Sequence, residues 1–297
     1  MDLMILAIAE GLLYGMMALG VFLTYRILDF PDLTSEGAFP LGAAVCARLL
    51  LSGMPALAAT FLSLLAGMGA GLVTGLLVTK GRLPGLLAGI LTMTGLYSIN
   101  LRIMGRSNTS LLEAEKLQNL FGMNRFLEVY RVIGMGVAVS SALILFLVWF
   151  FQTEAGQSVI ATGDNEKMAR SLGISTDNMK ILGLMFSNGI IAASGALIAQ
   201  NNGYADIGMG IGTIVIGLAS VIIGEVLFKN LTLPGRLVSI LLGAISYRLI
   251  LMFVISAGLN PNDLRLVSAI LLAFFLMLPD LQMHLKKQTY LERRRSE

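Results

Sequence analysis

Long apolar blocks recur along the whole chain, and they constrain its fold more than any other feature of the sequence. A helix of about 20 apolar residues spans the roughly 30 Å hydrocarbon core of a bilayer. About nine membrane segments, in a range of about eight to ten, are therefore predicted, because the second and ninth windows are short for that thickness. The windows cover residues 3–24, 37–51, 56–79, 83–99, 129–151, 181–200, 208–228, 237–257 and 266–278.

Composition supports an all-α, polytopic transmembrane helical bundle. The 297 residues are 56% hydrophobic and only 13% charged, whereas about 25% charged residues is usual in soluble domains. No Pro-rich or Ser-rich linker divides the chain, so residues 1–297 are predicted to form a single transmembrane domain in the lipid bilayer. The net charge of +3, with its one strongly basic run in the tail at 281–297, does not indicate a nucleic-acid partner.

The sequence lacks the residue types of most metal and catalytic sites. Cys46 and His284 are its only cysteine and its only histidine, so neither a zinc-type ligand cluster nor a His-based nucleophile is available. No Gly-Lys dipeptide occurs, which excludes the phosphate-binding loop of a P-loop ATPase. We therefore expect no catalytic residue, no metal site and no cofactor in this chain.

Basic residues predict the orientation of the segments, because cytoplasmic loops of membrane proteins carry an excess of Lys and Arg. A cytoplasmic C-terminus places the polar stretch at 152–180 and the tail at 281–297 inside, and the stretch at 100–128 outside. The inside set is Arg26, Lys80, Arg82, Lys167, Arg170, Lys180, Lys229, Arg236 and the five basic residues of the tail. The outside set is Arg102, Arg106, Lys116, Arg125, Arg131 and Arg265.

The first interruption of the apolar pattern is the carboxylate-rich stretch at 29–37. Irregular backbone at membrane depth persists only where it is buried in protein or lines a water-filled cavity, and an intramembrane carboxylate is a functional candidate. The substrate path is therefore predicted to include Phe30, Asp32, Thr34 and Glu36. An ordinary interfacial turn, in which Asp32 or Thr34 caps the next helix, explains the same residues equally well.

A second interruption follows the sixth window, at residues 200–206. Broken apolar segments in corresponding places of two halves indicate a transport path between repeats. This pattern adds Asn201, Asn202 and Tyr204 to the predicted substrate path. A loop with a helix cap accounts for the two asparagines as well.

Glycines predict where helices approach one another closely. Gly67, Gly71 and Gly75 repeat every four residues, a spacing that lets backbones meet in lipid. The glycines at 208, 210 and 212 resemble a dinucleotide fingerprint, but they lack the preceding soluble strand and the acidic partner of such a site. We interpret them as helix packing or a break in the chain.

The polar stretch at 152–180 is too polar to span a bilayer, yet its apolar residues recur at helical spacing, which predicts short amphipathic helices on the membrane face. Within and after it, residues 163–174 (GDNEKMARSLGI) and 187–196 (SNGIIAASGA) closely resemble permease subunits of ABC importers. The resemblance is to the branched-chain amino acid and ribose permease superfamily. The run FPDLTSEG at 30–37 narrows it to the branch found with tryptophan and tyrosine type binding proteins.

This resemblance implies a permease of the bacterial cytoplasmic membrane that forms a homodimer or pairs with a homologous permease. Such a subunit docks an ATP-binding cassette subunit, which carries ATP and Mg, and receives its substrate from an extracytoplasmic binding protein. The implied substrate is a small polar solute, first of all an amino acid, aromatic ones included. The resemblance makes the coupling helix out of Gly163, Asp164, Asn165, Met168, Ala169, Arg170, Leu172, Gly173 and Ile174, for which a generic amphipathic surface helix is the alternative.

Two other classes of membrane protein are weighed against the importer. An ion-coupled secondary transporter, acting without an ATPase, would use carboxylates such as Asp32, Glu36 or Glu225. A membrane-embedded enzyme is disfavoured, because the sequence has no paired catalytic motif in its apolar segments.

Overall fold

The computed structural model describes residues 2–112, 114, 116–117, 128–228, 231–258, 263–264 and 266–277. The basic tail at 281–297 lies outside the described residues, as does Lys229. The helices are α1 (Asp2–Phe22), continued by a π-helical turn η1 (Leu23–Ile27), then α2 (Ser35–Leu51), α3 (Ala56–Thr79), α4 (Gly85–Met104), α5 (Glu128–Gln152), α6 (Glu154–Asp164), α7 (Glu166–Ser171), α8 (Thr176–Asn202), the 3₁₀ turn η4 (Ile207–Gly210), α9 (Thr213–Leu227) and α10 (Leu233–Ser256). Two short strands, β1 (Asn108–Ser110) and β2 (Tyr204–Asp206), complete the fold.

Seven helices among the described residues are long and apolar enough to cross a membrane. They correspond to seven of the predicted windows, namely those of α1 with η1, α3, α4, α5, α8, η4 with α9, and α10. The second window forms α2, which has only 17 residues, and the ninth yields the shorter apolar helix Leu266–Met277. The predicted total of nine is therefore not confirmed, and the two windows that fall short are the two whose length was in question.

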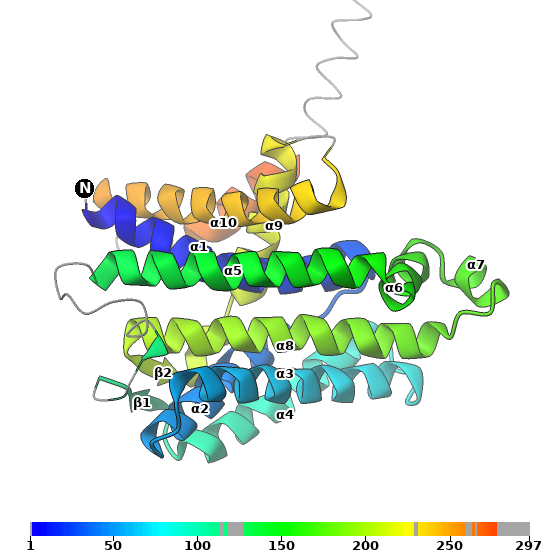
Figure 1. Cartoon of the computed structure of the whole chain (residues 1–297), viewed down its shortest axis with the longest axis horizontal. Helices are drawn as coiled ribbons and strands as arrows, with labels where there is room; N and C mark the ends of the chain where they lie inside the picture. Colours follow the sequence, from blue (N-terminus) through cyan, green and yellow to red (C-terminus); the bar gives the residue numbers. More distant parts are fainter. Residues whose placement is uncertain are drawn as a thin grey trace, which may run out of the picture.

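The long helices lie side by side, with α8 at the centre of the bundle (Figure 1). Helix α8 packs on α1, α2 and α3, and it is the most deeply buried of the seven spans. Helix α10 packs along α1 and α9. Helices α3, α4 and α5 leave much of their apolar surface exposed, as expected of helices that face lipid or a second membrane subunit.

Loops that are distant in sequence meet at the same end of the bundle. Strands β1 and β2 pair antiparallel, with Thr109 opposite Ala205, so the stretches after α4 and after α8 lie together. Helices α6 and α7 lie at the opposite end (Figure 1). Residues 108–110 and 204–206 therefore lie at one end of the bundle, and α6 and α7 lie at the other.

The glycine repeat on α3 packs against α8, as its spacing predicts. A Cβ built on Gly71 would overlap the backbone carbonyl of Leu184, and one on Gly75 would lie 3.0 Å from the Cα of Ile181. Gly69, between them on the same helix, has open space around it. The glycines at 208–212 mark a chain break, as one of the two interpretations predicted, because η4 ends there and Gly212 adopts a φ of +84° before α9.

These contacts predict opposite effects for two neighbouring substitutions. Gly71→Ala pushes α3 away from α8 and should lower the free energy of unfolding by about 1–3 kcal/mol, the usual cost of overpacking. Gly69→Ala adds a methyl group where there is room and should leave stability unchanged or raise it by up to about 1 kcal/mol through helix propensity. Thermal unfolding of the two purified variants measures the difference. Equal unfolding temperatures would show that α3 and α8 do not depend on this close approach.

Candidate functional site

The first interruption forms a buried polar centre between η1 and α2. Asp32 is 4% exposed and holds two hydrogen bonds through different carboxylate oxygens. Its Oδ1 accepts from the backbone N–H of Thr34 at 2.9 Å, and its Oδ2 accepts from Nδ2 of Asn188, on α8, at 2.7 Å. Asp32 therefore fastens the irregular segment to the central helix.

Hydroxyl groups extend this centre to two more helices. Oγ1 of Thr34 lies 2.7 Å from Oγ1 of Thr74 on α3, and Thr74 in turn donates to Oγ1 of Thr92 on α4 at 2.9 Å. All three threonines are buried. Buried polar groups need partners, and here they find them in one continuous chain that joins the irregular segment to α3, α4 and α8.

The backbone on the way to Asp32 is irregular. The π-helical turn η1 ends α1, and Asp29 follows with a φ of +49°, a left-handed conformation that is rare outside glycine. The N–H of Phe30 donates to the carbonyl of Thr24 at 2.9 Å, and its ring lies over Gly85 at the start of α4. Strained backbone and π-turns cluster at functional sites, which favours a functional segment over an ordinary interfacial turn.

The buried centre yields a stability prediction. Asp32→Leu leaves the Thr34 N–H and the Asn188 amide without their acceptor and should cost about 1–3 kcal/mol for each group left unpaired. Asp32→Asn keeps an acceptor oxygen and should cost less. Circular dichroism of the purified variants during heating reports both values. An Asp32→Leu protein that unfolds at the wild-type temperature would contradict the role of Asp32 as a fastening point.

Glu36 belongs to a different part of the site, as the second residue of α2. Its Oε1 accepts the N–H of Gly212 at 3.0 Å, which ties α2 to the start of α9. Pro40 has no N–H to donate to the Glu36 carbonyl, and Gly210 packs on that carbonyl so closely that a Cβ would overlap it. Glu36 also lines a cavity of about 290 Å³ between α2, α4 and residues 207–211.

The residues predicted from the second interruption lie at the end of the bundle rather than in this cavity. Asn201 and Asn202 end α8, and their side chains lie 3.4 Å apart in a weak hydrogen bond. Tyr204 is 44% exposed and belongs to β2, opposite Ser110. The structure thus joins Asp32 and Thr34 by a hydrogen bond, and it directs the Phe30 ring to Gly85 instead. Glu36 lies beside the segment that follows β2, whereas Asn201, Asn202 and Tyr204 lie at the end of the bundle.

Sequence reasoning missed several polar residues of this centre, namely Thr74, Thr92, Asn100 and Asn188. All four lie in long, mainly apolar helices: Thr74 in α3, Thr92 and Asn100 in α4, and Asn188 in α8. Asn188 carried the clearest signal, because an amide within an apolar segment needs a partner inside the protein. Which partner it has could not be read from the sequence, since Asp32 is 156 residues away along the chain.

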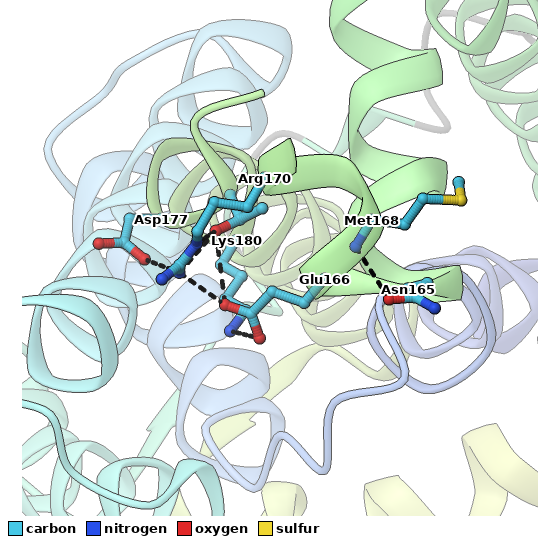
Figure 2. A network of polar contacts seen from close by, with 7 residues as sticks. Asn165, Glu166, Met168, Arg170, Asp177 and Lys180 are labelled. Atoms are coloured by element: carbon cyan, nitrogen blue, oxygen red, sulfur yellow. Dashed lines mark hydrogen bonds and ion pairs between the residues drawn. The ribbon is translucent and has the colours of Figure 1, made fainter. Parts of the chain in front are cut away.

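At the opposite end, the polar stretch forms the two short helices α6 and α7, as predicted. Thr153 caps α6 by accepting from the N–H of Gly156 at 3.2 Å, and Asn165 caps α7 by accepting from the N–H of Met168 at 3.0 Å. Figure 2 shows how α7 is joined to the start of α8 through charged side chains. Glu166 pairs with Arg170 at 2.9 Å and with Lys180 at 2.7 Å.

The ion pairs stabilise the charged form of Glu166. The hydrogen bond from Lys180, with the positive charges of Lys180 and Arg170, lowers the pKa of the Glu166 carboxyl below its ordinary value of 4.5. Arg170 reaches Asp177 as well, at 3.4 Å, and donates to the hydroxyl of Thr176 at 2.9 Å. Exposed ion pairs contribute little stability singly, but together these contacts fix the direction in which α7 projects from α8.

The faces of α7 differ sharply in exposure. Ala169 is fully buried within the chain, whereas Met168 and Leu172 are 51% and 70% exposed. Gly173, two residues after the end of α7, adopts a φ of +86°, a left-handed backbone conformation that favours glycine. Gly163, at the end of α6, packs directly on the backbone carbonyl of Ile27, where a Cβ would overlap it. Asp164 is exposed and Ile174 half-buried, so the outward surface combines apolar and polar groups.

Comparison with known proteins places these features in a family. The profile of branched-chain amino acid transport system permease components matches residues 3–278. A tyrosine transport system permease protein of Clostridioides difficile (strain R20291) is 42% identical over 278 residues, which cover 94% of this chain and 92% of that protein. An uncharacterized protein of Rickettsia prowazekii (strain Madrid E) is 32% identical over 276 residues, covering 92% and 96% of the two chains.

Solved structures support the same fold. PsaBC from Streptococcus pneumoniae in complex with Fab superposes with a TM-score of 0.50 at 14% identity, over 92% of this chain and 89% of that one. An inward-facing metal-chelate type ABC transporter also gives 0.50 at 14% identity, over 94% and 85%. The chain is thus a multi-helix ABC-type transport subunit, and it belongs to the family of branched-chain amino acid transport system permease components.

Family membership decides between the classes considered from the sequence. The chain is a membrane-spanning permease subunit of an ABC transporter and not an enzyme. The structure also weakens the case for Glu225 as an ion-coupling carboxylate, because both of its oxygens accept from Arg26, at 2.8 and 2.7 Å.

Proposed function

We propose that this chain is the translocating subunit of an ATP-driven importer for an amino acid, aromatic ones included. An extracytoplasmic binding protein delivers the substrate, and ATP and Mg bind to a partner subunit. The observation that carries the proposal is a backbone contact between Gly163, at the end of α6, and the carbonyl of Ile27, five residues before Asp32. It joins a surface suited to a partner with the irregular segment inside the bundle. The tyrosine permease of Clostridioides difficile supports the substrate class.

The surface of α7 suits a docking partner. Met168 and Leu172 present apolar surface to the outside, while the ion pairs of Glu166 and Arg170 hold the helix in place from behind. A projecting apolar surface that ion pairs hold in one orientation is suited to a groove on an ATP-binding cassette subunit. In this proposal Asp164 and Asn165 lie at the edge of the contact, where Asn165 also caps α7. Ala169, which is buried within the chain, sets the distance between α7 and α8.

Movement of α7 has a direct way into the bundle. Gly163 is in close contact with the backbone carbonyl of Ile27, and Ile27 is the last residue of the π-helical turn η1, two residues before Asp29. Because this contact is between backbone atoms, a displacement of α6 cannot be absorbed by a change of side-chain rotamer. A shift of α6 therefore reaches the segment that carries Asp32 and Thr34, and through Asn188 it reaches α8.

A second permease, identical or homologous, completes the path in this proposal. Helix α4 has the lowest mean hydropathy of the seven spans, 1.3, and its outward surface carries Thr94, Tyr97 and Ser98. Polar groups at membrane depth are favoured at protein or water rather than at lipid. This face of α4 is therefore suited to a path between two subunits.

The docking surface predicts a specific uncoupled variant. Leu172→Glu places a charge where apolar surface meets the ATPase subunit, and an unpaired buried charge is costly, so association should weaken about tenfold or more. The yield in the membrane should stay normal, because Leu172 makes little contact within this chain. Co-purification with the ATPase subunit and substrate uptake measure the effect.

Leu172→Met serves as the matched control, since it keeps the site apolar and of similar size. It should retain both association and uptake. If Leu172→Glu associates and transports as well as Leu172→Met does, α7 is a bland surface helix and not the docking element.

Orientation in the membrane gives a further test. We place α6, α7 and the C-terminus in the cytoplasm and the ends of α8 and β2 outside, as the excess of basic residues favours. In a Cys46→Ala background, a membrane-impermeant maleimide added to intact cells should label Asn202→Cys and spare Lys167→Cys. Both positions are exposed, so burial cannot mask the label. Labelling of Lys167→Cys alone would reverse the topology.

A further inference from the structure

The cavity beside Glu36 contains polar groups whose hydrogen-bonding capacity is unused. It lies between α2, α4 and the segment around η4, and its volume of about 290 Å³ is just below the usual range for small-molecule sites, about 300–1,000 Å³. Its lining residues are Glu36, Gly37, Pro40, Met93, Thr94, Tyr97, Asn100, Ile207, Gly208 and Ile211. A cavity of this size admits a solute no larger than an amino acid.

Glu36 offers one free carboxylate oxygen to this cavity. Its Oε1 is held by the N–H of Gly212 at 3.0 Å, which fixes the orientation of the carboxylate. Among the described residues Oε2 has no hydrogen-bond partner and no cation pairs with Glu36. The carboxylate is half-buried, so it presents negative charge from a position that protein partly shields.

Asn100 provides an independent sign of an absent ligand. Its side chain is fully buried, and its Nδ2 donates to the carbonyl of Gly37 at 3.2 Å. Its Oδ1 is buried without a partner among the described residues, although an unpaired buried acceptor costs about 1–3 kcal/mol. The donor on Nδ2 identifies the other atom as the acceptor, so the unpaired atom of Asn100 is an oxygen, on a residue that lines the same cavity as Glu36.

The remaining walls define what else the ligand carries. Tyr97 and Met93 come from α4, and Ile207 and Ile211 come from the segment around η4. Aromatic rings and thioethers pack well against aromatic groups, and the face of a tyrosine ring attracts cations. The cavity thus combines a negative polar corner with an apolar and aromatic wall.

We propose that this cavity binds the ammonium group of an amino acid, with Glu36 as counter-ion and Asn100 Oδ1 as second acceptor. The inference rests on the proposed function and adds to it the position at which the substrate is recognised. An ammonium group has three donors and no acceptor, so it pairs with both free oxygens, and the apolar wall receives the side chain. A solute whose only charge is negative is rejected by Glu36. A divalent metal is disfavoured, because the described residues contain no group of three or more His, Cys, Asp or Glu that could hold one.

Binding to the permease, purified with its ATPase subunit in lipid nanodiscs, tests the site by titration calorimetry with three probes. L-tyrosine and tyramine carry the ammonium group, and 3-(4-hydroxyphenyl)propionate has the same ring and no ammonium. The wild-type complex should bind the first two saturably and the third at least about tenfold more weakly, since a charge-assisted pair is lost. Equal binding of all three probes, or no saturable binding of tyramine and tyrosine, would overturn the proposal.

Two isosteric variants separate the site from general electrostatics. Glu36→Gln keeps an oxygen for the Gly212 N–H but removes the charge, and it should weaken tyrosine and tyramine about tenfold. Asp206→Asn removes a charge at the same end of the bundle and outside the cavity, where Asp206 accepts from the Gly208 N–H at 2.7 Å. This control should change the affinity less than about twofold. Equal loss in both variants would contradict a specific site.

Uptake into vesicles that contain the ATPase and binding protein distinguishes this inference from the proposed function. Tyrosine uptake by wild type that Glu36→Gln leaves unchanged, together with unchanged binding, rejects the cavity and keeps the importer. Binding that depends on Glu36, in a wild-type complex that takes up no amino acid under ATP, keeps the cavity and rejects the importer.

Discussion

The close contact of α8 with its neighbours is the constraint on which the rest of this structure depends. Lipid tails are as apolar as leucine, so membrane helices associate through tight packing and polar contacts rather than through the hydrophobic effect. Both occur on α8. Glycines of α3 lie against its backbone near Leu184, and one turn along, Asn188 binds Asp32. Packing and hydrogen bonding thus act on neighbouring turns of the same helix.

The irregular segment between η1 and α2 is tied to other elements on both of its sides. Before the segment, the backbone carbonyl of Ile27 is in close contact with Gly163. After it, the Glu36 carboxylate accepts a hydrogen bond from the N–H of Gly212, directly before α9. Between them Asp32 is fastened to α8. A regular helix through this region would satisfy its own backbone and would need none of these contacts. Because the chain is irregular there, it depends on α3, α4, α8 and α9, and it responds when any of them moves.

The class of the protein could be predicted from the sequence, and so could the local features of its candidate sites. Apolar length indicated seven spans among the described residues, whereas the predicted total of nine is not confirmed, because α2 and the helix at Leu266–Met277 are shorter than the other seven. The helical spacing at 152–180 predicted the short helices, and the glycine spacing on α3 predicted a close helix contact without identifying α8 as the partner. The motif at 163–174 was expected to form one helix, but it is divided between the end of α6 and α7. Carboxylates in the first interruption were identified as functional candidates, but their separate environments were not distinguished.

What the sequence by itself determined is therefore periodic or local: which blocks are apolar, where the chain breaks, and which motif marks the family. Tertiary structure alone decided that Asp32 is buried against Asn188, that Glu36 borders a cavity with Asn100, and that Ala169 faces inward while Leu172 faces out. The physical reason is that a polar residue in an apolar helix carries no local sign of its partner. Asn100 and Gly37 are 63 residues apart and Asn188 and Asp32 are 156 apart, and only the packing of the bundle brings them together.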